Sequence, residues 1–472
     1  MSIVVLGAGA AGLTAAWDLV RHQIPVIVIE KEARPGGLCQ TFEKDGFRFD
    51  LGGHRFITKN RELEQEMLQL LGNDFLKRRR KSVILFEGHE FAYPLKIEDI
   101  FRNLGPKRAF SAVLSYLKNQ WKTRRGEIDT STFEGWARSH FGEDLYHKFF
   151  GPYTSKLWGI PPAELASDWA GQRISLLNLT QTFFHLLHLS RKKPRTYAME
   201  YYYPRRGIGQ MFERMAESIE QNGGTIYYNT VLKSIRTESN QIRTITVVGP
   251  SGQWDIEAKG YISTIPLSHV VQAFDIPHAS EIRESCDFLK YRALRCLNLL
   301  IDHESFGDIT WRYVADGHRM ITRIQEPKQR SPESAPQGKT SLMLEIPCNE
   351  GDEMWNAAET AILPRAFREL KELGFDIESK LLGIFSTRTP HAYPLFRVGY
   401  EIHRKRLLEF LQQFPQFSTC GRQGTFRYIF QDTAQLMGRS AASQWFETGA
   451  PKKQWVEMDR QSELQEIQAT TA

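Results

Sequence analysis

Residues 3–30, IVVLGAGAAGLTAAWDLVRHQIPVIVIE, decide the fold of this chain. They open with a short apolar run, residues 3–6, that stops at Gly7. A stretch with apolar residues at helical spacing follows, and a second apolar run occupies residues 26–29. Strand, tight turn, helix and strand in this order predict the opening of a doubly wound α/β sheet.

Gly7, Gly9 and Gly12 form the pattern G-x-G-x-x-G in the context that it requires, between a strand and a helix. The first glycine permits the tight turn, the second lets a pyrophosphate approach the backbone, and the third lets helix and strand pack closely. The helix N-terminus offers free N–H groups to phosphates. Glu30 ends the second strand, where an acid accepts hydrogen bonds from ribose hydroxyls. The sequence therefore predicts dinucleotide binding, and a glycine-rich structural turn is the alternative.

Two further glycine pairs follow soon after Glu30. They are Gly36-Gly37 in RPGG and Gly52-Gly53 in FDLGGH. A nicotinamide dinucleotide needs no such extension, whereas FAD, with its ribityl chain and isoalloxazine, does. We therefore expect non-covalent FAD, with NAD(P)H as a candidate external reductant.

These segments resemble the FAD-binding fold of the amine oxidase and protoporphyrinogen oxidase superfamily, as do the strand end STIP at residues 263–266 and Val231 after a strand. A narrower resemblance is to UDP-galactopyranose mutases. It rests on motifs in order along the chain: GHRFITKN (53–60), YTSKLWG (153–159), Arg173-Ile174, TRIQE (322–326), AYP (392–394) and GRQGTFRYIFQD (421–432). Two segments, FDLGG (49–53) and YPRRGIGQ (203–210), instead look more like protoporphyrinogen oxidases.

The resemblance implies a set of site residues. Cofactor-binding residues would be Gly7, Gly9, Ala10, Ala11, Gly12, Glu30, Lys31, Gly36, Gly37, Leu38, Gly52, Gly53, His54, Arg55, Val231, Gly421, Arg422 and Asp432. Catalytic residues would be His54, Arg173, Arg323, Arg422, Tyr393 and Tyr428, with Tyr153 and Trp158 beside the substrate. The alternatives are structural ion pairs for the arginines, core packing for the aromatic residues and an ordinary loop position for His54.

Two enzymatic functions remain open at this point, beside a non-enzymatic one in which FAD is a structural ligand. The resemblance to the mutases implies the first, a flavoenzyme acting on a sugar linked to a nucleotide or lipid diphosphate, by mutase (isomerase) or redox chemistry at flavin N5. The arginines agree with it, because a diphosphate needs two or more fixed cations and guanidinium groups match phosphate oxygens best. The second is an oxidase or dehydrogenase of the protoporphyrinogen or amine oxidase type, acting on an apolar or amine substrate. In both readings the protein is an enzyme, either an FAD-dependent oxidoreductase or a flavin-dependent mutase.

The chain has 472 residues, 41% hydrophobic and 25% charged, which excludes intrinsic disorder and leaves room for two to three domain-sized units. We expect a discontinuous Rossmann-like FAD-binding domain of residues 1–60, 201–285 and 415–447. A mostly helical insertion (61–200), an α+β substrate domain (286–414) and a polar tail (448–472) complete the division.

The net charge of +6 is mild and gives no nucleic-acid signature. Five scattered cysteines, without a C-x-x-C pair, argue against a disulfide framework or a metal site and favour the cytoplasm. One helical pattern places Phe110, Val113, Leu114, Leu117 and Trp121 on one face among basic residues. That helix is a candidate for peripheral contact with an anionic membrane, although an ordinary domain helix has the same pattern.

Overall fold

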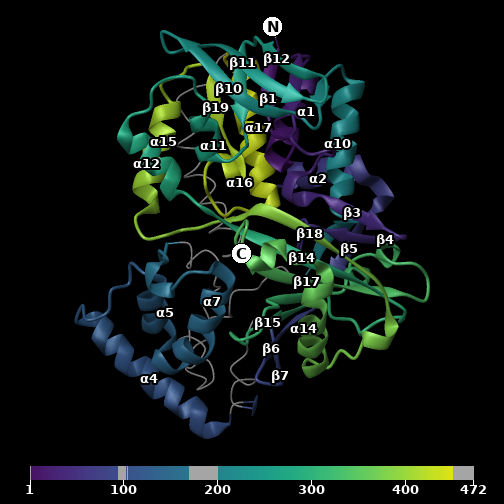
Figure 1. The fold of residues 1–472 in the computed structure, drawn as a ribbon, viewed down its shortest axis with the longest axis vertical. Helices are drawn as coiled ribbons and strands as arrows, with labels where there is room; N and C mark the ends of the chain where they lie inside the picture. The colour runs from purple at the N-terminus through teal and green to yellow at the C-terminus, as the bar shows by residue number, and fades with distance from the viewer. Residues whose placement is uncertain (1, 94–101, 104, 169–199, 450–472) are drawn as a thin grey trace.

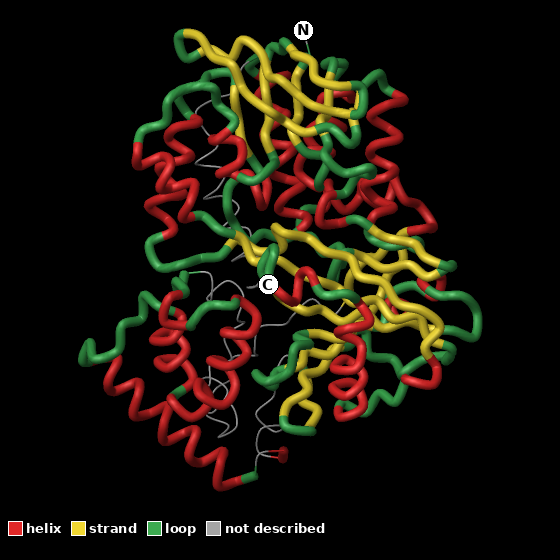
Figure 2. Tube along the Cα trace, viewed as in Figure 1, coloured by secondary structure: helices red, strands yellow, loops and turns green. Residues whose placement is uncertain are grey.

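The computed structural model describes residues 2–93, 102–103, 105–168 and 200–449. Figure 1 shows two sheets one above the other, with a group of helices beside the lower one. In Figure 2 the two sheets appear as two groups of strands (yellow), and the lower left of the view is mainly helical (red). Arg173 and all but the first two residues of the predicted tail lie outside the described residues.

The upper sheet has five parallel strands in the order β19-β13-β1-β2-β9. These strands are β1 (Ile3–Leu6), β2 (Val26–Ile29), β9 (Thr225–Tyr227), β13 (Gly260–Ser263) and β19 (Phe417–Thr419). The apolar runs of β1 and β2 are buried on both faces, as a parallel sheet between two layers requires. The expected Rossmann-like fold is confirmed.

Two layers cover this sheet. Helices α1 (Ala10–Arg21), α10 (Gly209–Gln221) and α17 (Gln431–Glu447) share one hydrophobic cluster with it. The other cluster combines the sheet with β10 (Val231–Glu238), β11 (Gln241–Gly249), β12 (Gly252–Ile256), α11 (Leu267–Gln272), α12 (Ser280–Phe288) and α15 (Tyr400–Leu411).

The lower sheet has seven strands in the order β18-β14-β17-β16-β15-β6-β7. They are β6 (Ser82–Phe86), β7 (His89–Ala92), β14 (Tyr291–Ile301), β15 (Trp311–Val314), β16 (Arg323–Gln325), β17 (Thr340–Cys348) and β18 (Leu381–Pro394). Helices α13 (Glu353–Asn356) and α14 (Glu359–Glu372) follow β17. Strand β18 forms an edge of this sheet and faces the upper half of the molecule.

The segment expected to be mostly helical contains α2 (Arg61–Leu71), α4 (Pro106–Arg124), α5 (Phe133–Phe141), α6 (Glu143–Leu145) and α7 (Gly151–Trp158). It also supplies β6 and β7 to the lower sheet, and β5 (Phe75–Arg79), which pairs with β8 (Glu200–Pro204). The run of basic residues at 77–81 interrupts the apolar alternation that would have indicated these strands. Two small elements complete the fold: the hairpin β3 (Thr41–Lys44) with β4 (Phe47–Asp50), and α16 (Gly421–Gly424).

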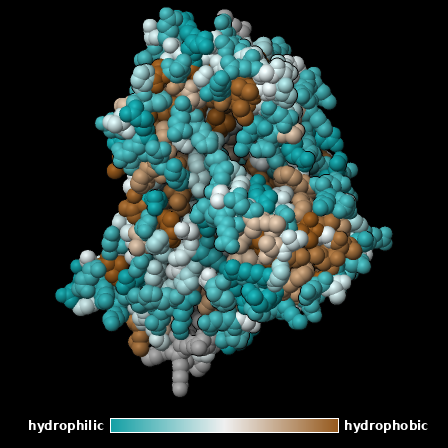
Figure 3. All heavy atoms as spheres, viewed as in Figure 1, coloured by the Kyte–Doolittle hydropathy of each residue, from teal (hydrophilic) through white to brown (hydrophobic). Residues whose placement is uncertain are grey.

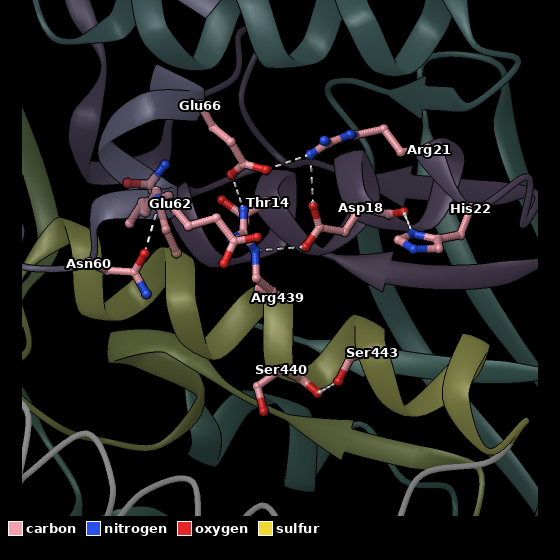
Figure 4. A network of polar contacts seen from close by, with 12 residues as sticks. Thr14, Asp18, Arg21, His22, Asn60, Glu62, Glu66, Arg439, Ser440 and Ser443 are labelled. Atoms are coloured by element: carbon pink, nitrogen blue, oxygen red, sulfur yellow. Dashed lines mark hydrogen bonds and ion pairs between the residues drawn. The ribbon is translucent and has the colours of Figure 1, made fainter. Parts of the chain in front are cut away.

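A polar network fastens the N-terminal helix to helices distant in sequence (Figure 4). Arg439 on α17 donates from Nε to Asp18 on α1 at 3.1 Å and pairs with Glu66 on α2. Arg21 joins the same Glu66 at 2.9 Å. The network therefore fixes α17, which borders the groove described below, against the first βα unit.

On the face that Figure 3 shows, hydrophobic residues (brown) reach the surface in separate patches within a mainly hydrophilic (teal) surface. Among the described residues, none of the helices combines the length and the apolar character needed to cross a membrane.

Candidate active site

A groove of about 950 Å³ separates the carboxyl ends of the upper strands from the edge strand β18. The upper wall comprises the loops after β1, β2 and β13, and residues 385–391 of β18 form the opposite wall. Crevices at the carboxyl ends of parallel strands are where α/β proteins bind ligands.

The first glycine loop leaves space at one position only. Gly9 is the N-cap of α1, and a Cβ built on it would meet nothing closer than Gly37 Cα at 3.9 Å. A Cβ on Gly12 would lie 1.9 Å from the Gly7 carbonyl oxygen, and Gly7 itself has φ +100°. Gly7 and Gly12 therefore serve the chain's own packing, whereas Gly9 leaves room in front of a helix N-terminus, the place where a pyrophosphate binds.

Glu30 lies where the sequence predicted it, at the end of β2 on the groove wall. Its carboxylate accepts hydrogen bonds from the backbone N–H of Ala8 at 2.6 Å and of Glu32 at 2.9 Å. Burial raises the pKa of Glu30 despite these two bonds. These two bonds fix the carboxylate at the groove, where it can accept a hydrogen bond from a ribose hydroxyl group.

Most of the expected cofactor residues border this groove. Those on its wall are Gly7, Gly9, Ala10, Ala11, Glu30, Lys31, Gly36, Gly37, Leu38, His54, Val231, Gly421 and Arg422. Five are not on the wall: Gly12, Gly52, Gly53, Arg55 and Asp432. For Gly12 the reason is the helix–strand packing described above, and Gly53 lies behind the loop, against Arg323.

His54 lines the groove where the second glycine pair ends. Burial, together with the guanidinium groups of Arg422, Arg330 and Arg323, lowers the pKa of His54 to about 3. Its Nδ1 is buried without a hydrogen-bond partner in the described structure. His54 therefore presents a neutral imidazole to the groove over the whole physiological pH range.

Glu345 organises the polar interior behind this loop. Its Oε1 accepts from Gly53 N–H at 3.0 Å, from Arg323 Nη2 at 2.5 Å and from Gln325 Nε2 at 2.5 Å. The Gln325 Oε1 in turn accepts from Arg330 Nη2 at 2.8 Å. Strands β16 and β17 thus hold the glycine loop and two arginines in one network.

Four predicted aromatic residues gather near Arg323. The rings of Tyr393 and Tyr428 stack with centroids 5.5 Å apart, and Trp158 meets Tyr393 edge-on at 6.0 Å. Tyr153 interacts electrostatically with Arg323, which lowers the pKa of that phenol, although burial raises it more. Helix α7, the end of β18 and the loop before α17 therefore converge on one site.

Arg422, on α16, links the end of β18 to the loop before α17. Its guanidinium donates to the carbonyl oxygen of Ile429 at 2.6 and 3.2 Å and to that of Ala392 at 3.2 Å, and it lies 4.5 Å from the Tyr428 ring centroid. These contacts position Tyr428 beside the groove. The catalytic role expected for Arg422 stays a prediction.

Lys156, within the YTSKLWG motif, is a positioning residue. Its Nζ donates to the carbonyl oxygens of Val314, Asp316 and Ile321 at 2.8, 2.8 and 3.0 Å. Burial lowers the pKa of Lys156 to about 8. The lysine therefore attaches α7, with Tyr153 and Trp158, to the loop between β15 and β16.

Four residues of the site were missed by the sequence analysis: Glu345, Gln325, Arg330 and Tyr313. TRIQE contains Gln325, but nothing in that motif indicates an inward-facing amide. Glu345 and Arg330 become partners of this site only through the pairing of β16 with β17 and the turn after β16. No signal in the sequence would have linked them.

The fold and the groove together define an α/β protein with a groove of the kind that binds dinucleotides, and a cluster of aromatic and cationic side chains lies near His54 but does not line the groove itself. The chain belongs to the family described as flavin containing amine oxidoreductase, whose profile matches residues 10–417. The expected superfamily is thereby confirmed, and membership implies a flavin cofactor.

Relatives and structures divide between the two chemistries expected. The coproporphyrinogen III oxidase of Staphylococcus aureus is 22% identical over 52% of this chain and 57% of that protein. The dTDP-fucopyranose mutase of Escherichia coli is 28% identical over 35% of this chain and 44% of that protein. The chain thus matches about half the length of these relatives. A crystal structure of reduced UDP-galactopyranose mutase has the same fold, with a TM-score of 0.80, 20% identity and coverage of 97% of this chain and 98% of that one.

The residues present fit a flavin dinucleotide. Gly9 leaves space at a helix N-terminus, Glu30 presents a fixed carboxylate about where a ribose would lie, and the groove continues to His54. All three features border the same groove.

Proposed function

We propose that this protein is an FAD-dependent enzyme acting on a sugar linked to a nucleotide or lipid diphosphate. The observation that supports the proposal is the position of Arg323. Its side chain is only 19% exposed, its Nε is buried without a hydrogen-bond partner in the described structure, and it lies directly behind the glycine loop that precedes His54.

The balance of charge around His54 supports an anionic substrate. Arg323, Arg330 and Arg422 all act electrostatically on this histidine. Glu345 pairs with Arg323, but its carboxylate is shared with Gly53 and Gln325. Burying cations that a ligand does not use is unfavourable, so an enzyme for an uncharged ring would gain nothing from them.

Each group has a distinct part in this proposal. Bound FAD would supply electron-pair or hydride chemistry at N5, and NAD(P)H would be the external reductant. Arg323 would bind the diphosphate, with Arg173 as a second cation. Tyr153, Trp158, Tyr393 and Tyr428 would enclose the sugar and its carrier, and neutral His54 would contact the flavin without adding charge. The mutase relatives favour isomerisation of the sugar, and redox chemistry at the same site is the variant.

The alternative is an oxidase or dehydrogenase for an apolar or amine substrate, which the resemblance to a coproporphyrinogen III oxidase favours. The two functions differ in the ligand that Arg323 meets. An amine would leave Arg323 without a ligand, and a porphyrinogen would bring propionate carboxylates to it, so the response to nucleoside diphosphates is what separates the two functions.

Titration of the flavin-loaded protein with UDP and dTDP, followed by flavin absorbance and fluorescence at low salt, separates these functions. We expect saturable changes whose dissociation constant rises at least about tenfold in Arg323→Gln, because a charge-assisted bond to phosphate is lost. Arg243→Gln, on the exposed part of β11, is the matched control. Perturbation by a hydrophobic amine or a porphyrinogen, with none by nucleoside or prenyl diphosphates, would establish the oxidase instead.

We also propose a cytoplasmic protein that touches membranes through α4, as a lipid-linked substrate would favour. This helix contains no acidic residue, and Leu114, Leu117 and Trp121 on it are each more than half exposed. Arg125 lies 4.3 Å from the centroid of the Trp121 ring. Exposed apolar residues flanked by basic ones are typical of helices that lie on anionic membranes.

A further inference from the structure

A second cationic cluster lies beside Tyr313, whose ring is also close to Arg323. We call it the Arg55 subsite. It consists of Arg55, Arg80, Tyr93, Tyr201, Trp311 and Tyr313. These residues come from five places in the chain: the glycine loop, the end of β5, the end of β7, β8 and β15.

Aromatic rings enclose the two arginines. The Arg55 Cζ lies 5.3 Å from the Trp311 ring centroid, and the Arg80 Cζ lies 4.5 Å from that of Tyr93 and 6.0 Å from that of Trp311. The rings of Tyr93 and Tyr313 are 4.9 Å apart. Both arginines therefore lie against the Trp311 ring, with aromatic side chains around them.

Two buried donors in this cluster lack partners. Arg55 Nη1 and the hydroxyl of Tyr201 are both inaccessible to solvent and form no hydrogen bond in the described structure. Among the described residues, no carboxylate forms an ion pair with Arg55. Burial and repulsion by the guanidinium group of Arg80 lower the pKa of Arg55. Buried polar groups are almost always hydrogen-bonded, so these donors indicate a missing acceptor.

The Arg55 subsite adjoins the proposed diphosphate site. The Arg323 Cζ lies 5.8 Å from the Tyr313 ring centroid, and the phenol of Tyr313 interacts electrostatically with Arg323, Arg80 and Arg55 alike. His54 faces the groove, whereas Arg55, the next residue, does not line it. Tyr313 therefore connects the Arg55 subsite with Arg323.

We propose that the Arg55 subsite binds an oxoanion, a carboxylate or a phosphate, borne by the sugar portion of the substrate in addition to its diphosphate. The identity of the whole substrate rests on the proposed function, but binding of an oxoanion by Arg55 does not. Guanidinium matches both oxoanions by paired hydrogen bonds, and the anion would accept from Arg55 Nη1 and neutralise the repulsion between Arg55 and Arg80.

The first experiment compares two nucleotide sugars on the flavin-loaded protein, UDP-galactose and UDP-galacturonic acid, which differ by one carboxylate. We expect the acidic sugar to bind at least about tenfold more tightly, and Arg55→Gln to abolish this preference while leaving the affinity for UDP unchanged. Arg79→Gln is the matched control, because Arg79 adjoins Arg80 in sequence but its side chain is 83% exposed. The proposal is overturned if the wild type binds both sugars with equal affinity and the anions of the second experiment, described next, do not stabilise it either.

The second experiment does not depend on the proposed function. The melting temperature of the flavin-loaded protein is measured with increasing inorganic phosphate or acetate at constant ionic strength. We expect stabilisation of the wild type and of Arg79→Gln, but not of Arg55→Gln or Arg80→Gln. Response to phosphate alone identifies a phosphorylated sugar, and response to acetate identifies an acidic sugar.

If UDP fails to bind while phosphate or acetate stabilises only the proteins with Arg55, the proposed function is wrong and the Arg55 subsite stands. If neither anion discriminates between wild type and Arg55→Gln, the arginines are structural. Arg80→Gln replaces Arg55→Gln throughout if the latter does not fold.

Discussion

At the scale of single residues, the three glycines of one motif have separable roles. We predict that Gly9→Val folds but binds no flavin, because its side chain would occupy open space at the helix N-terminus. Gly12→Val should fail to fold, because its Cβ would overlap the Gly7 carbonyl oxygen. Circular dichroism and flavin absorbance after reconstitution distinguish the two variants. A yellow Gly9→Val protein would contradict the assignment of the groove.

His54 gives a prediction about pH. Its pKa falls from an ordinary value near 6.5 to about 3 on folding, so between these values the unfolded chain binds the proton and the folded chain does not. Stability should therefore decrease as pH falls through this interval, by about 2 kcal/mol at pH 5 relative to neutral pH. We predict that His54→Gln removes this share of the acid sensitivity.

Urea unfolding of the flavin-free protein at pH 7 and pH 5 measures the effect. His391, whose pKa burial also lowers to about 3, supplies the matched variant His391→Gln, which should behave in the same way. Identical losses of stability in wild type and His54→Gln between the two pH values would show that His54 titrates normally.

At the scale of elements, α4 contributes no residue to the groove wall. Figure 1 shows it at the lower left edge of the molecule. We predict that the protein sediments with vesicles containing phosphatidylglycerol but not with pure phosphatidylcholine, and that salt weakens the binding. The double variant Leu117→Gln, Trp121→Gln should lose binding and keep its flavin. Leu382→Gln, an equally exposed leucine on β18, is the control. Sedimentation of the double variant with anionic vesicles would eliminate α4 as the contact.

Strand β17 shows how an element assembles a site. It carries Glu345 into register with Arg323 of β16, and the same carboxylate reaches the backbone of Gly53 in the distant glycine loop. Lys156 performs the corresponding function for α7. In both cases a helix or strand places a charged side chain where it forms hydrogen bonds with carbonyl, amide or guanidinium groups of other segments.

At the scale of the whole molecule, the groove has one wall in each half, since the upper loops and β18 both border it. A ligand that fills it should stabilise the complete fold, by about 2.7 kcal/mol at a free concentration one hundred times its dissociation constant. We predict that FAD raises the melting temperature of the flavin-free wild type and leaves that of Gly9→Val unchanged. Equal shifts in both proteins would place the flavin elsewhere.

The sequence by itself determined the first βα unit and the family, because each depends on local signals, and the dinucleotide site that it predicts stays a prediction. A strand, a glycine turn and a helix N-terminus lie within thirty consecutive residues, and the short motifs that follow keep their order. Thirteen of the predicted cofactor residues accordingly line one groove.

Only the tertiary structure decided which groups lie together beside the glycine loop that precedes His54. Glu345, Gln325, Arg330 and Tyr313 become neighbours of the glycine loop through strand pairing, and pairing between distant strands leaves no mark on either segment alone. The same holds for Arg55 and Arg80, which the sequence presents as a loop residue and part of a basic run. They come together beside Trp311 and Tyr93 because the chain folds the ends of β5 and β7 next to β15, and the burial of Arg55 becomes visible only there.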